Sequence, residues 1–302
     1  MNNLSIFAIV ISFNPKLDLL TKEYESIVHQ VDGIIYIDNN SLNKDAVALW
    51  SNNRDKVDLI QLDNNYGIGV AQNAGIKKAL DNGATHIIIF DQDSVVNEDF
   101  VKTLFEAEEN ALNSGVNVGI TGPIYKSFND NYLYPIITLK GNNLIEIPYD
   151  SFKEYVQVSH VIASGSLIRR QVFEKVGLLN ESLFIDFIDF EFCFRARKYG
   201  YDTIITKAAC MHHMMGDKQI LLFGRKIGIY SPFRRYFDAR NAILIWRKNL
   251  LPTALCKHYI KILFGKILVS FMFGPDRLRQ FKYISKGLYD GLRGIDGFCT
   301  VH

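Results

Sequence analysis

The sequence predicts an α/β protein with a mostly parallel central sheet. Over the first 120 residues, short β-branched apolar runs alternate with longer helical patterns, which is typical of βαβ units. The apolar runs are continuous, as expected for strands that helices cover on both faces. A chain of 302 residues with 48% hydrophobic and 22% charged residues can bury a sizeable core, in one large domain or one domain with an appendage.

Each expected element can be placed along the chain. Strands are predicted at residues 6–12, 33–37, 57–62, 86–90 and 118–122, with helices at about 16–29, 43–51, 70–80 and 97–114. The apolar opening lacks a basic leader and is too short to span a membrane, so we expect a buried strand and not a signal peptide. Short alternating runs around Gly141-Asn142-Asn143 predict an antiparallel hairpin, and helical patterns return at 170–177 and 188–199. Residues 230–302 show helical patterns only, which predicts a boundary between residues 229 and 230.

Net charge is close to zero, but its distribution is uneven. Residues 225–302 hold 15 of the 34 Lys and Arg but only 4 of the 32 Asp and Glu, which leaves 19 and 28 for residues 1–224. A basic C-terminal region on a mildly acidic body indicates an anionic partner, either a phospholipid surface or a polyanion. The four cysteines show neither C-x-x-C pairs nor zinc-like spacing, so we expect reduced thiols in a cytosolic protein.

The first candidate site follows the apolar run at residues 86–90, in the sequence Asp91-Gln92-Asp93. In open α/β sheets, ligands bind at the carboxyl ends of the strands. Two carboxylates one residue apart can hold a divalent cation, which can in turn hold a diphosphate. The alternative is that these acids open a loop and cap the helix expected near Asn97.

Two further polar segments follow expected strands. Asp38 and Asn40 end the second one, where Asp38 could accept a hydrogen bond from a pyrimidine imide or a ribose hydroxyl; the alternative is an Asx-turn. The third strand leads into a helix through Gly67 and Gly69. A dinucleotide fingerprint would need glycine where Gln72 stands and would follow the first strand, which argues against NAD binding. These glycines could bring backbone N–H groups near a ligand or serve packing alone.

Three acidic residues, Asp186, Asp189 and Glu191, stand among aromatic residues at the start of an expected helix. Asp186 is expected to be its N-cap, with Asp189 in the first turn. Glu191 precedes Arg195 by four residues and is expected to pair with it on one helical face. Asp189 has no evident partner in the sequence, which makes it the candidate general base.

A histidine pair follows a short expected strand. Adjacent histidines on a strand point to opposite faces, so at most one of His212 and His213 enters a given site. His213 is the candidate, as an imidazole ligand beside Asp93 for Mg²⁺ or Mn²⁺, because the Gly216-Asp217 loop follows it. The alternative is a hydrogen-bonded histidine of the core.

Residues 259–273 form an apolar stretch that two lysines interrupt. Basic residues flank it at Lys257, Arg277, Arg279, Lys282 and Lys286. This pattern predicts an amphipathic helix in the plane of an anionic bilayer. The alternatives are a helix packed on the main domain or on a second subunit.

Taken in order, these motifs resemble those of the inverting glycosyltransferases of family 2 with the GT-A fold, and within that family the bacterial rhamnosyltransferases. The resemblance covers roughly residues 5 to 250. It rests on Val10-Ile11-Ser12-Phe13-Asn14-Pro15, Asp38-Asn39-Asn40-Ser41, the stretch from Gly67 to Gly75, Asp91-Gln92-Asp93-Ser94, Ser164-Gly165-Ser166, Asp189-x-Glu191 with Arg195, His213-x-x-Gly216-Asp217, Arg234-Arg235-Tyr236 and Arg240-Asn241.

The resemblance implies a role for each matching position. Asp38 would read the base, Asp91 would lie near the ribose, and Asp93 with His213 would hold the metal. Further donor contacts are implied for Ser12, Asn14, Asn40, Gly69, Gln72, Asn73 and Gln92. The acceptor and the transferred sugar would lie by Ser164, Gly165, Ser166, Asp186 and Glu191. Asp189 stands where the family has its catalytic Asp, although many relatives carry Glu where this chain has Ile188.

The implied architecture is a GT-A catalytic domain at residues 1–229 and a basic helical region at 230–302 that binds a membrane or forms oligomers. The donor half would end near residue 120, and the acceptor half would follow. The implied reaction moves L-rhamnose from dTDP-β-L-rhamnose, with inversion, to a saccharide hydroxyl in O-antigen or capsule assembly. The implied cofactor is Mg²⁺ or Mn²⁺. A UDP- or GDP-hexose donor is the alternative.

The implied setting is the cytoplasmic face of the plasma membrane, with a polyprenyl-diphosphate-linked acceptor, an anionic bilayer, a possible second copy and no nucleic acid. Two other classes compete. A nucleotidyltransferase would typically carry a glycine- and basic-rich loop after the first strand, whereas residues 12–17 contain one Lys and no glycine. A non-catalytic carbohydrate- or nucleotide-binding protein would lack the metal carboxylate or the base, whereas Asp93 and Asp189 are both present.

Overall fold

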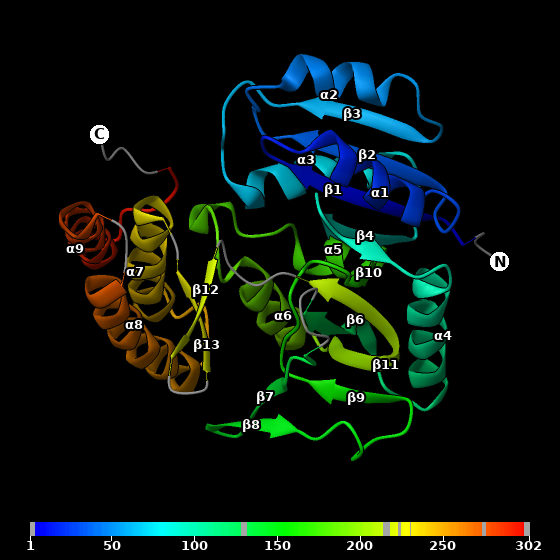
Figure 1. The fold of residues 1–302 in the computed structure, drawn as a ribbon. Helices are drawn as coiled ribbons and strands as arrows, with labels where there is room; N and C mark the ends of the chain where they lie inside the picture. The colour runs from blue at the N-terminus through cyan, green and yellow to red at the C-terminus, as the bar shows by residue number, and fades with distance from the viewer. Residues whose placement is uncertain are drawn as a thin grey trace.

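The computed structural model of this chain describes residues 4–127, 132–213, 218–222, 225–229, 231–273 and 276–298. A large sheet forms its centre, helices cover the two faces of that sheet, and three long helices pack together at one side (Figure 1). The α/β class, with a mostly parallel sheet and C-terminal helices, agrees with the sequence prediction.

The N-terminal half consists of alternating strands and helices. The strands are β1 (Ile6–Ser12), β2 (Gly33–Asp38), β3 (Val57–Gln61), β4 (His86–Asp91), β5 (Val95–Val96) and β6 (Val118–Ser127). The helices are α1 (Leu17–Ile27), α2 (Lys44–Ser51), α3 (Ile68–Asp81) and α4 (Phe100–Asn113). The five strands and four helices expected here are confirmed, although β6 is five residues longer than predicted and the pattern does not predict β5.

Strands β3, β2, β1 and β4 lie side by side in that order and run parallel. Ser12 of β1 pairs with Asp38 of β2, and Ile11 of β1 pairs with Asp91 of β4. Because parallel strands end at the same edge of a sheet, three polar residues that end their strands meet there. We call this edge, with the loops that follow β1, β2 and β4, the donor edge.

The parallel strands are buried on both faces, and alternate residues supply two separate cores. Ile9 and Ile89 belong to a core shared with α3, α5 and α6, whereas Val10 and Phe90 belong to a core shared with α1 and α4. This two-sided burial explains why the strands read as continuous apolar runs. Gly75 lets α3 lie close to the sheet, because an added Cβ would come within 2.6 Å of side-chain atoms of β1 and β2.

The second half of the sheet is mixed. Its elements are β7 (Ile136–Lys140), β8 (Asn143–Ile147), β9 (Tyr155–Val158), β10 (Leu167–Arg169), α5 (Arg170–Val176), the 3₁₀ turn η1 (Glu181–Leu183), α6 (Ile188–Lys198), β11 (Asp202–His213), β12 (Lys218–Leu222) and β13 (Arg225–Ile229). Strand β10 runs antiparallel between β4 and β6, and β11 lies parallel to β6. The β7–β8 hairpin is confirmed at its expected turn, whereas β10 and the β12–β13 hairpin are additions to the prediction.

Helices α7 (Pro232–Arg247), α8 (Thr253–Phe273) and α9 (Arg277–Arg293) form the C-terminal group. Ser231 caps α7 by accepting the N–H of Arg234 at 3.3 Å, and proline occupies the first turn. Gly287 and Gly291 let α9 approach the backbone of α7, where an added Cβ would meet carbonyl oxygens. None of the helices in the described part of the chain is both long and apolar enough to cross a membrane. The domain boundary at residues 229 and 230 stays a prediction.

Candidate active site

The loops after β1 and β2 are tied to each other at the donor edge. Asn14 donates its backbone N–H to Ser41 Oγ at 2.7 Å, and its Oδ1 accepts the N–H of Leu42 at 2.7 Å. Asn14 and Asn40 have positive φ angles of 49° and 63°, a region that asparagine tolerates better than most residues. These bonds fix the loops around the end of β2, with Asn14 exposed and Asn40 half-buried.

Asp38 is fully buried at the end of β2, yet only one of its carboxylate oxygens is hydrogen-bonded. Oδ2 accepts the N–H of Ser41 at 3.2 Å, a local turn bond of the kind expected as the alternative. Oδ1 is buried and has no hydrogen-bond partner. Leaving such a group unpaired costs about 1–3 kcal/mol, so Oδ1 is an acceptor available to a ligand. The neighbouring Ser12 is also buried and donates to the carbonyl of Ile37 at 3.3 Å.

The turn from Asp91 to Ser94 is built against the segment from Ser164 to Ser166. Ser164 Oγ accepts the backbone N–H of Asp91 at 3.2 Å and lies 3.2 Å from Ser94 Oγ. Gly165 donates its N–H to the carbonyl of Ile89 at 2.7 Å. The two predicted segments are therefore in direct contact. Asp91 and the two residues after it are half-buried, so their side chains keep some access to solvent.

The same segment connects the donor edge to Asp189, in the first turn of α6. Asp189 Oδ1 accepts the N–H of Phe190 at 2.9 Å, and the N–H of Ala163, next to Ser164, also bonds to this carboxylate. Tyr125 lies beneath this junction and donates to the carbonyl of Ser164 at 2.9 Å. A continuous path of contacts therefore runs from Asp91 through Ser164 and Ala163 to Asp189.

Burial raises the pKa of Asp189 to about 7. The negative charge of Asp186 adds to the rise, while the N–H groups of Phe190 and Ala163 oppose it. A general base works best when its pKa lies near the working pH, because it is then both deprotonated and basic enough. The environment of Asp189 therefore suits the role of base that the sequence predicts for it.

The loop before Asp189 has an unusual backbone. Phe184, Asp186 and Phe187 have φ angles of 63°, 63° and 65°, although none of them is glycine. Such conformations cost on the order of 1 kcal/mol or more each and persist only where surrounding contacts hold them. We call residues 182–187 the strained loop.

Helix α7 supplies the contacts that hold the strained loop. Arg240, fully buried, donates to the carbonyl of Leu183 at 3.0 Å and to the carbonyls of Ser182 and Gly297. Asn241 donates to the carbonyls of Leu183 and Ile185 at 2.8 and 2.6 Å. The resemblance includes these two residues without giving them a role, and among the several charged residues of α7 nothing in the sequence singles them out.

Phe184 packs tightly at the centre of the strained loop. Its ring stacks on Phe237 of α7 with centroids 4.4 Å apart, and Phe298 lies 5.8 Å away. Its carbonyl accepts the N–H of Ile68 at 2.7 Å, and an added Cβ at Gly67 would come within 2.6 Å of Phe184. The packing alternative for Gly67 is therefore correct.

Several predicted site residues serve the packing of this region. Gly69 faces residues 180 and 181, where an added Cβ would lie 3.3 Å from their backbone. Asn73 is buried, and its side chain forms hydrogen bonds with the backbone of Leu179 and the carboxylate of Glu181, at 2.8–3.0 Å. These contacts give both residues a packing role, and the donor contacts predicted for them stay predictions. Gln72 is also buried, but its Oε1 has no hydrogen-bond partner, so its donor contact stays a prediction.

The acidic cluster divides into three different environments. Both carboxylate oxygens of Glu191 bind Arg195, at 2.8 and 3.0 Å, so the expected pairing is confirmed, and the acceptor role of Glu191 stays a prediction. The N-cap prediction for Asp186 is wrong, because the cap position is Phe187 and Asp186 binds Arg234 at 3.2 Å. Asp186 therefore links the strained loop to α7, and its acceptor role stays a prediction.

The metal site is only partly visible in the structure. Within the described residues, no three His, Cys, Asp or Glu side chains form a group that could hold a metal ion. The predicted ligand His213 ends β11, but its side chain lies outside the described part, as do Gly216 and Asp217. The antiparallel pair of His212 with Val95 brings the backbone of His213 next to the Asp93–Ser94 turn. The metal role of Asp93 and His213 therefore stays a prediction.

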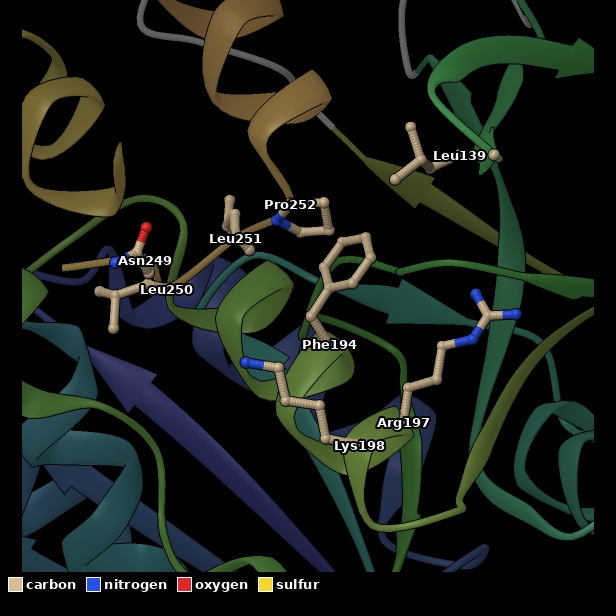
Figure 2. Close-up of a pocket in the computed structure, with 9 residues that line it drawn as sticks. Leu139, Phe194, Arg197, Lys198, Asn249, Leu250, Leu251 and Pro252 are labelled. Carbon is tan, nitrogen blue, oxygen red and sulfur yellow. The ribbon is translucent and has the colours of Figure 1, made fainter. Parts of the chain in front are cut away.

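Neither of two cavities in the structure contains a predicted site residue. One, of about 480 Å³, lies between α6, the loop before α8 and the β7–β8 hairpin (Figure 2). Figure 2 shows Phe194, Arg197 and Lys198 rising from α6 toward this space, opposite Pro252. The other, of about 650 Å³, lies between the start of α4 and β11. The assignment of the donor edge and Asp189 therefore rests on their chemistry and not on these two cavities.

Comparisons with known proteins agree with this geometry. The profile of the family described as "Glycosyl transferase family 2" matches residues 7–177. A dTDP-rhamnosyl transferase, RfbF of Shigella flexneri, is 35% identical over 301 residues, covering 98% of each chain. The structure of residues 1–349 of S. aureus TarS in complex with UDP-GlcNAc is similar, with a TM-score of 0.54 and 16% identity over 97% of this chain and 82% of that one. GalNAc-T7 with UDP, GalNAc and Mn²⁺ gives a TM-score of 0.56 and 15% identity over 97% of this chain and 58% of that one.

Proposed function

This chain belongs to glycosyl transferase family 2, and we propose that it transfers L-rhamnose from dTDP-β-L-rhamnose, with inversion, to a hydroxyl of a saccharide acceptor in cell-surface polysaccharide synthesis. The observation that carries the proposal is the path of contacts from Asp91 through Ser164 to Asp189, since it joins a nucleotide-binding edge to a carboxylate base. Rhamnose itself rests on the 35% identity to the dTDP-rhamnosyl transferase.

The donor edge supplies the groups that a nucleotide needs. Asp38 Oδ1, which is buried without a hydrogen-bond partner, is proposed to accept the imide N–H of thymine. Asp91 ends β4 two strands away and is proposed to lie near the ribose. Gln92 already accepts the N–H of Phe13 at 2.8 Å, so its proposed part is to hold the first loop over the donor.

Asp189 is the proposed general base. As the acceptor hydroxyl attacks the anomeric carbon, Asp189 takes its proton, which is worth roughly 10²–10⁴-fold in rate for a well-placed base. The diphosphate leaves from the opposite face of the sugar, so a single displacement inverts the anomeric centre. Asp93 and His213 would hold a divalent cation together with the donor diphosphate, and that cation would neutralise charge on the leaving group. Mn²⁺ accompanies UDP in GalNAc-T7, which supports metal dependence here.

The acceptor is proposed to be a polyprenyl-diphosphate-linked saccharide at the cytoplasmic face of the plasma membrane. The basic C-terminal helices support this setting, since lipid-linked acceptors and anionic lipids share that surface. The segment from Ser164 to Ser166 and Asp186 are proposed to lie by the transferred sugar and the acceptor. A second copy of the chain is a further possible partner.

The test compares the full chain with Asp189→Asn, whose side chain has the same shape. We expect titration calorimetry to show metal-dependent binding of dTDP-rhamnose by both proteins and no binding of UDP-glucose, UDP-galactose or GDP-mannose. We expect the variant to lose at least about 100-fold of the transfer rate, because it cannot accept the proton. A preference for a UDP- or GDP-hexose would overturn rhamnose as the sugar, and undiminished transfer by Asp189→Asn would overturn the base.

A further inference from the structure

We propose that one face of α8 and α9 docks on an anionic lipid bilayer. Five large apolar side chains of this face are exposed: Phe264 (69%), Leu268 (61%) and Met272 (53%) on α8, and Leu278 (85%) and Phe281 (56%) on α9. The three on α8 are four residues apart and so form one stripe along the helix. Phe271 and Phe281 have ring centroids 6.0 Å apart, which joins the two stripes into one surface. We call it the α8–α9 face.

Basic residues surround this face. The exposed positions Lys257 and Lys261 continue the α8 side, and Arg277, Arg279 and Lys282 lie at the start of α9. Helix α8 contains no Asp or Glu. An apolar stripe with a cationic border is the pattern of a helix that lies at the boundary between lipid headgroups and acyl chains.

The two acidic residues of this part of the chain have other tasks. Asp276 caps α9 by accepting the N–H of Arg279 at 3.3 Å. Asp290, only 2% exposed, binds Tyr236 at 2.6 Å and Lys286 at 2.5 Å on the side of α9 that packs on α7. The border of the α8–α9 face therefore carries a clear cationic excess.

That charge pattern favours a bilayer over a second copy of this chain. A two-fold interface brings the same patch of each copy together, so the lysines and arginines of one copy would face those of the other and repel them. Anionic headgroups attract and neutralise these residues, while the apolar stripe enters the lipid. Figure 1 shows α8 and α9 on the side of the molecule away from α4 and the N-terminal strands.

Helix α8 also connects this face to the base. Tyr259 on α8 lies 4.8 Å from the ring of Phe187 and 5.9 Å from that of Phe190, the residues on either side of the Ile188–Asp189 pair. At 1.5 Å per residue, Phe264 to Met272 lie about 8–20 Å further along the helix axis. This connection rests on the proposed function: a lipid-linked acceptor would then place a sugar near its own membrane anchor at Asp189.

The experiment is flotation of the full chain with vesicles, with neither donor nor acceptor present. We expect binding to vesicles of phosphatidylcholine mixed with phosphatidylglycerol, little binding to phosphatidylcholine alone, and release as salt is raised. Leu268→Glu should weaken vesicle binding about tenfold or more, because it places a charge in the apolar stripe. The matched control is Leu49→Glu on α2, where the leucine is similarly exposed (69% against 61% for Leu268) but lies outside the α8–α9 face.

Two results would overturn the docking proposal. One is equal or absent binding to both kinds of vesicle. The other is a dimer in light scattering that Leu268→Glu dissociates, because a second copy would then cover the face. Transfer to a short water-soluble acceptor separates this proposal from the proposed function: Leu268→Glu should retain it, and if the unaltered chain shows no transfer while vesicle binding holds, the function alone fails.

Discussion

The donor edge and the strained loop place their functional groups in opposite ways. At the donor edge, strand register brings Ser12, Asp38 and Asp91 together, and all of the pairing strands come from the first 91 residues. The strained loop has no ladder of its own. Its carbonyl oxygens are held by Arg240 and Asn241, which follow it by more than 50 residues.

If the proposed roles hold, this difference separates donor binding from catalysis. The strands of the donor edge pair with one another and not with the C-terminal helices. The strained loop leads directly into Asp189, so the hydrogen bonds from α7 to this loop help to position the proposed base. Damage to the first region should therefore appear in donor affinity, and damage to the second in the turnover rate.

The largest test of this contrast is Arg240→Met. Loss of the guanidinium frees the carbonyls of Ser182, Leu183 and Gly297, and the strained backbone can relax. We expect kcat to fall about 100-fold, since a displacement of about 1 Å in a catalytic group has an effect of that size. Donor affinity measured by calorimetry should stay within a few-fold.

Arg247→Met on the same helix is the matched control, because Arg247 is exposed and binds only the carbonyl of Leu292 among its described hydrogen bonds. It should keep nearly full turnover. If Arg240→Met weakened donor binding and left kcat unchanged, α7 would serve the donor edge and the contrast would fail.

Asp38→Ala tests the other region. Removing the buried carboxylate takes away a charged acceptor, an interaction worth about 1.5–3 kcal/mol, so donor affinity should fall about 10- to 100-fold. With donor at saturation, kcat should change little. Asp58→Ala is the control, because Asp58 is an exposed acid of β3 whose only ion pair among the described residues is with Lys78 at 3.7 Å. Unchanged donor affinity in Asp38→Ala would remove Asp38 from the donor site.

A smaller effect is expected from pH. Because the pKa of Asp189 is raised to about 7, kcat/KM should fall about tenfold for each pH unit below 7 and level off above it. The stability of the fold should change in the opposite direction. An unfolded Asp titrates near 3.9, so the folded chain holds an extra proton between about pH 4 and 7 and loses that advantage as pH rises through 7.

Urea unfolding at pH 5 and pH 8 measures this second effect. Relative to Asp189→Asn, the unaltered chain should lose on the order of 2 kcal/mol of unfolding free energy between the two pH values. A flat difference across that range would mean that Asp189 titrates normally. Its role as a base tuned to neutral pH would then be wrong.

The same contrast explains what could be predicted from the sequence. The strands of the donor edge are continuous apolar runs, and each ends at a polar residue. The local sequence pattern therefore predicts both the parallel sheet and the position of Asp38 and Asp91 at the same edge of it. Asp189 is visible because it is an acid without a partner at i ± 4 in a helix. Family likeness added the segment from Ser164 to Ser166, whose contact with Asp91 no local pattern indicates.

The misses come from contacts between distant residues. Asp186 looks like a helix cap in its own sequence, but its partner Arg234 lies 48 residues further on. Strand β10 has three residues, too few for a period, and owes its place to β4 and β6 on either side. In the sequence, Arg240 is only one of the charged residues of a helix. The folded structure shows that it binds carbonyl groups of the strained loop. The packing of residues 179–181 against Gly69 and Asn73 is likewise absent from the local pattern, because these residues lie more than 100 positions apart in the sequence.

The hydrogen bond from Arg240 to the carbonyl of Gly297 has a consequence for how the chain folds during its synthesis. Chains are synthesised from the N-terminus at about 5–20 residues per second. The residues that end β1, β2 and β4 all lie within the first 91 positions. Gly297 and Phe298, which hold Arg240 and Phe184 in place, are synthesised some 200 residues later. A nascent chain is therefore expected to form its donor edge well before the strained loop, and with it the proposed base, is held in position.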